Sequence, residues 1–459
     1  MKLIVIGGGY AGYVAAIKAA MLGAEVTLIE KGNIGGNCIN AGSISSKALL
    51  APLEIMENVF TADKFGVKIE GDIKLDFNYM VSRKDSILKQ LVSRIECILK
   101  TRGVKIIRGT AKLLSKKTVE VIMKDDRKKL LEADKIIIAT GSVPVVPPMF
   151  PYDGKHVITS DEVLSLKKLP ESLVVAGGGP IGCEIGQLLS KLGTDVKIIE
   201  KHDCLISSFE DEELANELQS VLKRDKVQLI LGDSIKSVEV KDGKVYTNLE
   251  SGKKLKSELM LLSVGRKAYI DGLRLEELGV AIERGKIVVN DKLETNIEGI
   301  LAVGDVNNTI SLANVALMEG IVAAENAFNK DKRMNYKAVP RCIFTLPEIA
   351  AVGVTEKQLK DKNIKYKVGR FNFAEQAKAE IVGKTQGFVK VIADKDDKII
   401  GASIFGAHAT DLLAELTLAV HLSLTCQEMG NVIYSHPTLS EAIMEALHDV
   451  NNGSVHSIK

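Results

Sequence analysis

Short apolar runs rich in β-branched residues alternate with longer segments of helical character in the first part of the chain. Lys2–Ile6 is such a run, and the glycine-rich segment Gly7–Gly12 (GGGYAG) separates it from an Ala-rich stretch that ends near Leu22. A second apolar run, Glu25–Ile29, follows soon after. This order predicts a strand, a glycine turn, a helix and a second strand.

The same order of apolar and glycine-rich segments returns later in the chain. The mainly apolar run Ser172–Ala176 precedes Gly177–Gly182 (GGGPIG), a helical segment reaches Leu192, and another apolar run covers Asp195–Ile199. A lone glycine motif is a weak indication, but strand, turn, helix and second strand in the same order twice is a strong one. We therefore expect two Rossmann-like dinucleotide-binding units in one α/β chain.

The residues around each glycine turn have a defined chemistry. Glycines let backbone N–H groups approach a pyrophosphate at the start of a helix, and an acidic residue at the end of the second strand binds a ribose. That acidic residue stands 23 positions after the first glycine in both copies (30 − 7 = 23 and 200 − 177 = 23). The candidate nucleotide-binding residues are therefore Gly7, Gly9, Gly12 and Glu30 in the first copy, and Gly177, Gly179, Gly182 and Glu200 in the second.

Composition narrows the class of protein further. Hydrophobic residues make up 46% and charged residues 26% of the chain, which is typical of a globular α/β protein. The 61 basic and 59 acidic side chains nearly cancel, so the charge favours neither nucleic acid nor an anionic membrane as a partner. The sequence has no uninterrupted apolar stretch of about 18 residues, and its cysteines are not spaced like a disulfide scaffold or a zinc site. We expect a cytoplasmic protein that acts on small molecules and holds no metal.

A segment between the two motifs carries the most specific chemistry. Residues 35–47 (GGNCINAGSISSK) resemble the G-G-x-C-x4-C-x2-S-K segment of the FAD-dependent pyridine nucleotide-disulfide oxidoreductases, in which two cysteines exchange electrons with a flavin. Cys38 matches the first cysteine, but Ser43 stands at the second position and Ser45 replaces the usual proline. A hydroxyl group cannot form a disulfide, so the dithiol chemistry of the family cannot use this pair.

The resemblance assigns FAD to the first glycine motif and NAD to the second. Residues 295–305 (TNIEGILAVGD) resemble the family's second flavin motif, which implies that Asp305 holds the ribityl chain. It also implies that the helix beginning near Leu312 points its N-terminal end at the flavin. Glu200 favours a free ribose 2′-OH, so we expect NAD over NADP, although the neighbouring Lys201 and His202 oppose that preference. The further cofactor-binding residues implied by the resemblance are Thr140, Gly141, Gly265, Leu312, Ala313 and Lys47.

The resemblance also implies a set of catalytic residues. Lys47, expected on the same helix as Cys38, matches the lysine that approaches flavin N5 and pairs with a glutamate, here Glu184. The motif at residues 436–441 (HPTLSE) implies that His436 is a general base oriented by Glu441, and that it acts on the flavin site of the other subunit of a homodimer. Cys38 stands at a helix entrance, where its thiolate would be favoured; a buried structural role is the alternative.

Together these motifs predict a domain order and a branch of the family. We expect an FAD domain over residues 1–146, an NAD domain over 147–266, a central segment returning to FAD over 267–335 and an α+β dimerisation domain over 336–459. Within the family the chain is most similar to the dihydrolipoamide dehydrogenase branch, which implies a dihydrolipoyl substrate and a 2-oxoacid dehydrogenase complex as partner. Because of Ser43, two alternatives stay open: an NAD(P)H diaphorase, oxidase or soluble transhydrogenase without the disulfide, and a non-catalytic FAD- and NAD-binding scaffold dimer.

Overall fold

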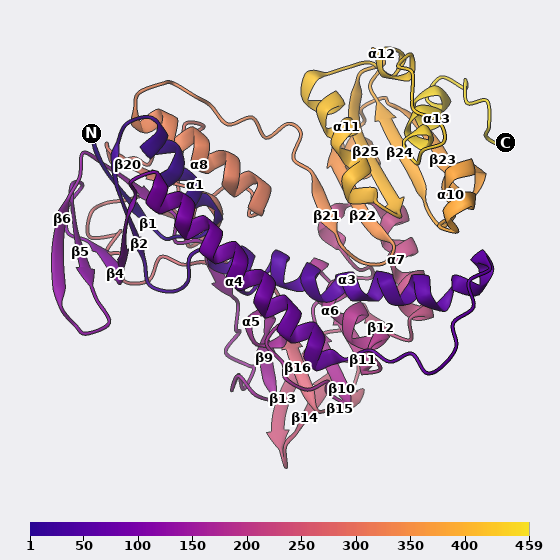
Figure 1. The fold of residues 1–459 in the computed structure, drawn as a ribbon, viewed down its shortest axis with the longest axis horizontal. Helices are drawn as coiled ribbons and strands as arrows, with labels where there is room; N and C mark the ends of the chain where they lie inside the picture. The colour runs from indigo at the N-terminus through magenta and orange to yellow at the C-terminus, as the bar shows by residue number, and fades with distance from the viewer. Residues whose placement is uncertain (459) are drawn as a thin grey trace.

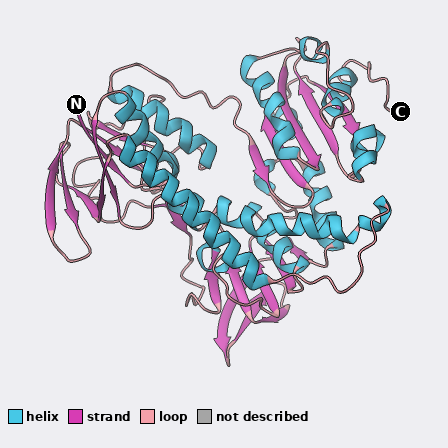
Figure 2. Ribbon diagram, viewed as in Figure 1, coloured by secondary structure: helices cyan, strands magenta, loops and turns pink. Residues whose placement is uncertain are grey.

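The computed structural model describes residues 1–458 and contains two parallel sheets and one large antiparallel sheet. In Figure 1 the N-terminal part lies on the left, the second nucleotide unit at the bottom and the C-terminal part at the upper right. Figure 2 shows that helices cover the sheets in all three parts. The fold class expected from the sequence is confirmed.

Strands from distant parts of the chain form the first parallel sheet. Its order is β20-β7-β1-β2-β3, so a strand from near residue 300 joins strands from the first 140 residues. Helices α1 (Tyr10–Met21) and α8 (Ala313–Ala327) pack closely, because Gly320 has no side chain; a Cβ there would lie 2.5 Å from the Ala11 carbonyl oxygen. The strands are β1 (Lys2–Ile6), β2 (Glu25–Glu30), β3 (Lys105–Arg108), β7 (Lys135–Ile138) and β20 (Ile300–Ala302).

The second parallel sheet repeats this architecture, in the order β12-β11-β10-β16-β9. Strand β16 is fully buried and β10 is buried except for its first residue, as expected for apolar runs that have helices or a second sheet on their faces. The strands are β9 (Val157–Thr159), β10 (Ser172–Ala176), β11 (Asp195–Glu200), β12 (Gln228–Leu231) and β16 (Leu259–Leu262), with helices α5 (Ser160–Val163), α6 (Pro180–Lys191) and α7 (Glu212–Arg224).

Smaller sheets and long helices join these units. The strands β8 (Ser142–Pro144) and β17 (Arg266–Ala268) pair where the chain passes between the two nucleotide units. Two long helices, α3 (Ser43–Phe60) and α4 (Phe77–Thr101), cross the middle of the molecule (Figure 1). The remaining strands are β4 (Thr110–Leu113), β5 (Thr118–Ile122), β6 (Lys128–Glu132), β13 (Ile235–Lys241), β14 (Lys244–Leu249), β15 (Lys254–Ser257), β18 (Ile282–Glu283) and β19 (Lys286–Ile287).

The C-terminal part is an antiparallel sheet, β21-β22-β25-β24-β23, flanked by helices. Its inner strands are almost entirely buried, and they share a separate hydrophobic core with the helices that follow. The strands are β21 (Arg341–Ile343), β22 (Glu348–Gly353), β23 (Lys367–Asn372), β24 (Phe388–Ala393) and β25 (Ile399–Gly406). The helices are α9 (Glu356–Asp361), α10 (Ala377–Val382), α11 (Ala409–Leu422), α12 (Cys426–Gly430) and α13 (Glu441–Asp449).

Candidate active site

The two glycine turns have nearly the same geometry. Gly7 and Gly177 have φ angles of +103° and +106°, a region that a side chain disfavours. A Cβ on Gly12 would lie 1.8 Å from the Gly7 carbonyl oxygen, and one on Gly182 would lie 2.1 Å from that of Gly177. In both turns, therefore, the first glycine makes the bend and the third lets helix and strand approach closely.

The acidic residues at the ends of β2 and β11 are held in the same way. Glu30 Oε2 accepts the Gly8 N–H at 2.6 Å, and Glu200 Oε2 accepts the Gly178 N–H at 2.7 Å. The other oxygen of Glu200 accepts the His202 N–H at 3.0 Å. Each carboxylate is thus fixed beside its glycine turn, where the sequence motif predicts that a ribose binds.

A cavity of about 570 Å³ runs from the first glycine turn to the segment around Cys38. This volume lies within the range of about 300–1,000 Å³ that is usual for cofactor pockets. Gly9 lines it, and a Cβ added there would meet only Gly36, at 3.8 Å, so the backbone lies open to a bound group. The predicted residues that line it are Gly7, Gly9, Glu30, Cys38, Lys47, Thr140, Gly141, Glu184, Asp305, Leu312 and Ala313. A long cavity over a glycine turn fits FAD.

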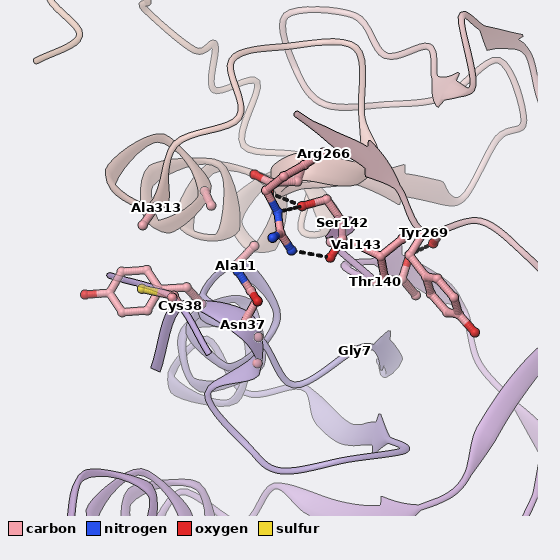
Figure 3. Close-up of a pocket in the computed structure, with 18 of the residues that line it drawn as sticks. Gly7, Ala11, Asn37, Cys38, Thr140, Ser142, Val143, Arg266, Tyr269 and Ala313 are labelled. Carbon is pink, nitrogen blue, oxygen red and sulfur yellow. Dashed lines mark hydrogen bonds between the residues drawn. The ribbon is translucent and has the colours of Figure 1, made fainter. Parts of the chain in front are cut away.

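Asp305 lies in this cavity as part of a network that the motifs do not predict. Ser142 Oγ donates to Asp305 Oδ2 at 2.6 Å, and Arg266 donates to both Ser142 Oγ and the Ser142 carbonyl oxygen, at 2.8 and 2.9 Å. Figure 3 shows Arg266 beside Ser142 at one side of the cavity. Arg266 directly follows the predicted Gly265, yet nothing in the local sequence indicates that β17 brings it to the flavin motif.

The end of the cavity near Glu30 holds a second contact that the motifs missed. Lys31 Nζ lies 3.6 Å from the centroid of the Tyr269 ring, a cation–π contact. Thr140 Oγ1 donates to the Tyr269 carbonyl oxygen at 2.6 Å, and the Tyr269 N–H donates to the Gly141 carbonyl oxygen at 2.9 Å. The predicted Thr140 and Gly141 therefore anchor the segment that carries this aromatic ring.

Cys38 and Ser43 face each other as the motif predicts, but on separate helices. Helix α2 (Gly36–Asn40) ends before Ser43, because Gly42 has φ and ψ of −141° and −131° and interrupts the helix. The single helix expected from Cys38 to Lys47 is thus wrong. The Cys38 thiol donates to Ser43 Oγ at 3.8 Å, and all six cysteines are free.

Cys38 is less acidic than its position at a helix entrance predicts. Burial raises the pKa of the Cys38 thiol, and this effect outweighs the hydrogen bond with Ser43 and the positive charge of Lys47, which both lower it. The nearby Asp305 raises the pKa further. This raised pKa supports the structural alternative for Cys38 over the favoured thiolate, because a half-buried site disfavours the charged form.

Lys47 and Glu184 form an ion pair between the two nucleotide units. Lys47 Nζ lies 2.7 Å from one carboxylate oxygen of Glu184 and 2.9 Å from the other. The Phe344 N–H donates to Glu184 at 2.9 Å, and the Phe344 ring centroid lies 4.3 Å from Lys47 Nζ. The structure thus brings together a lysine from α3 and a glutamate from α6 at one wall of the cavity.

His436 and Glu441 form a dyad that lies apart from this cavity within one chain. His436 Nδ1 lies 2.8 Å from Glu441 Oε1, and the imidazole is 74% exposed. Burial raises the pKa of Glu441, but hydrogen bonds from His436 and the Thr438 N–H outweigh it, so the net pKa is lowered. The ionised carboxylate therefore fixes the exposed ring through Nδ1.

Two further findings concern the described residues, 1–458. None of their helices is long and apolar enough to cross a bilayer. They contain no group of three or more His, Cys, Asp or Glu residues arranged to hold a metal ion.

Two dinucleotide units, a cavity lined by both of them and an antiparallel C-terminal sheet form the architecture expected of FAD- and nicotinamide-dependent oxidoreductases. Residues 1–320 match the pyridine nucleotide-disulphide oxidoreductase family and residues 339–447 match its dimerisation domain. The chain belongs to this family, whose members are enzymes that bind FAD and NAD(P).

Relatives and solved structures agree with this assignment. The chain is 38% identical to a dihydrolipoyl dehydrogenase of Bacillus subtilis over 460 residues, with 100% of both chains covered. It is 38% identical to the mitochondrial dihydrolipoyl dehydrogenase of Dictyostelium discoideum, covering 99% of this chain and 95% of the relative. The crystal structure of LpdA from Mycobacterium tuberculosis has a TM-score of 0.91 and 26% identity, and the match covers 98% of this chain and 99% of that one.

Proposed function

We propose that the protein is an NADH-oxidising flavoenzyme of the dihydrolipoyl dehydrogenase type that has lost the redox disulfide. The observation that carries this proposal is the contact between Cys38 Sγ and Ser43 Oγ, 3.8 Å apart, at the place where the family motif has two cysteines. Because Cys38 has no sulfur partner there, electrons that reach the flavin stay on it until an external acceptor takes them. Turnover of lipoamide is then low, while NADH-dependent reduction of dyes or quinones persists.

The cofactor assignments follow from the two glycine turns. The first turn, Glu30 and Asp305 would hold FAD, with its isoalloxazine ring near Lys47, and the second turn and Glu200 would hold NAD. Bound FAD would supply a centre that accepts two electrons from NADH. Lys47 places a positive charge at that end of the cavity, where it would stabilise negative charge on the reduced flavin, and Glu184 keeps it in place. The buried Glu200 carboxylate would repel a 2′-phosphate, which favours NAD over NADP.

The dyad supports a homodimer and a second candidate function. His436 is exposed and does not line the cavity of its own chain, so a partner subunit would have to carry it to Cys38. An imidazole fixed by a carboxylate suits removal of a proton from a thiol. The dyad therefore favours oxidation of a dihydrolipoyl group as the second candidate function. This group would be either free dihydrolipoamide or part of a 2-oxoacid dehydrogenase complex.

An anaerobic titration of the holoenzyme with NADH tests the proposal. We expect full reduction of the flavin with one equivalent of NADH per FAD, because the protein has no second two-electron store. The variant Ser43→Cys should take up two equivalents and gain lipoamide reduction, and Cys38→Ser in that background should remove both gains. Uptake of two equivalents or brisk lipoamide reduction by the unchanged protein would refute the proposal and favour the second candidate.

A further inference from the structure

A buried carboxylate behind the flavin motif has no role in the site described above. Glu319, on α8, has no exposed surface, yet its two oxygens accept four hydrogen bonds. Burial raises the pKa of Glu319, and these hydrogen bonds oppose that rise. A buried carboxylate is costly unless it is fully hydrogen-bonded, and a fully hydrogen-bonded one fixes the groups that donate to it.

One oxygen of Glu319 holds the turn that carries Asp305. Glu319 Oε2 accepts the Gly304 N–H at 2.6 Å and Asn307 Nδ2 at 2.9 Å, so it grips both ends of the short turn Gly304–Val306. Asp305 stands between these contacts, and its carboxylate faces the cavity next to Ser142. The position of Asp305 therefore depends on Glu319.

The other oxygen of Glu319 contacts the connection to the C-terminal domain. Glu319 Oε1 accepts from the Tyr336 hydroxyl at 2.8 Å and from the Thr309 hydroxyl at 2.5 Å. Tyr336 belongs to the segment between α8 and β21, which crosses from the first nucleotide unit to the C-terminal sheet (Figure 1). Tyr336 does not line the cavity.

We propose that Glu319 and Tyr336 are positioning residues of the flavin site, which act through the turn at Gly304 to hold Asp305 toward the ribityl chain. Tyr336 anchors the interdomain segment to Glu319, and Glu319 anchors the turn. A change at Tyr336, which has no contact with the cofactor cavity, thus weakens flavin binding. This inference rests on the proposed contact between Asp305 and FAD.

The experiment measures FAD release from the holoenzyme after dilution, by the rise in flavin fluorescence. Tyr336→Phe removes one hydrogen bond to a charged group and should speed release about tenfold. Tyr366→Phe is the matched control, because the Tyr366 hydroxyl also donates to a carboxylate, Glu356 Oε2 at 3.0 Å, far from the turn in sequence. It should leave the rate unchanged.

A double-mutant cycle with Asp305→Asn separates positioning from a general loss of stability. If Tyr336 acts through Asp305, adding Tyr336→Phe to Asp305→Asn should speed release no further. Glu319→Gln should release FAD nearly as slowly as the unchanged protein, since the hydroxyls of Thr309 and Tyr336 can turn to accept from the amide, whereas Glu319→Ala should release it fast.

Three results would overturn the inference: additive effects in the cycle, equal rates for Tyr336→Phe and Tyr366→Phe, or an unchanged rate in Asp305→Asn. An unchanged rate in Asp305→Asn would mean that Asp305 does not contribute to FAD binding, so Glu319 and Tyr336 could not act through it. NADH-dependent dye reduction by the unchanged protein tests the proposed function separately, so the two failures are distinguishable.

Discussion

Substitutions in the ion pair between Lys47 and Glu184 should affect the stability of the protein and the rate of flavin reduction differently. In Lys47→Met the Glu184 carboxylate, whose side chain is 8% exposed, loses its cation and keeps the Phe344 N–H. Removing one member of a buried pair costs about 3–5 kcal/mol, because the other charge stays buried without a partner. Lys47 itself is 27% exposed, so solvent screens part of the interaction and we expect a loss of about 2 kcal/mol. For cooperative unfolding of all 459 residues the melting temperature should fall by about 2 °C.

The double variant Lys47→Met/Glu184→Gln distinguishes the two roles of the pair. It removes the unpaired charge, so most of the lost stability should return in a thermal melt. Flavin reduction by NADH, measured by anaerobic stopped flow, should stay on the order of ten- to a hundredfold slower than in the unchanged protein, because the cation at the proposed flavin site is still missing.

A matched pair elsewhere supplies the control. Lys18 and Glu325 form an ion pair of 2.8 Å with side chains 29% and 17% exposed, and neither residue lines the cavity. Lys18→Met should lower the melting temperature slightly and leave the rate of flavin reduction unchanged. A Lys47→Met protein that melts like the unchanged one, or a double variant with a normal reduction rate, would refute this reasoning.

Two further predictions follow from other carboxylates. Glu200→Gln should narrow the preference for NADH over NADPH in flavin reduction about tenfold, because it removes the charge that repels a 2′-phosphate. The amide oxygen can still accept the Gly178 N–H, whereas the hydrogen bond from the His202 N–H is lost. An unchanged ratio would mean that Lys201 and His202 set the specificity. Burial raises the pKa of Glu445, but hydrogen bonds from His456, Ser454 and the backbone outweigh this effect, so the pKa in the folded protein is lowered. The ionised Glu445 therefore stabilises the folded C-terminal tail at neutral pH, and this stabilisation is lost as the pH falls through the folded pKa. Glu445→Gln should therefore speed proteolysis of the C-terminal tail at pH 7 but change its rate little in acid. A faster rate for the variant that persists in acid would contradict this role of the Glu445 carboxylate.

Local patterns in the sequence predicted the parts of the fold that depend on short-range order. The strands Lys2–Ile6 and Ser172–Ala176 begin and end where the apolar runs do, because a buried strand requires such a run between turn residues. The helix break at Gly42 was not predicted, because an isolated glycine within a helical pattern is often tolerated and does not by itself mark an end.

Long-range contacts in the site could not be predicted in this way. The contact of Arg266 with Ser142 joins residues 124 positions apart, and it exists because β17 pairs with β8. The stack of Lys31 on Tyr269 depends in the same way on how the chain returns from the second unit. Hydrophobic periodicity carries no information on such pairings, whereas the resemblance to a family did predict the pair of Lys47 with Glu184.

The position of Phe344 has an optical consequence. The chain contains no tryptophan, and the Phe344 ring lies beside the lysine and glutamate that join the two nucleotide units. An indole at this position would be the sole tryptophan emitter of the protein, next to the proposed isoalloxazine ring. Its emission would be quenched by energy transfer while flavin is bound and would change if this junction moved relative to the flavin, so a tryptophan here would report the distance between the junction and the flavin.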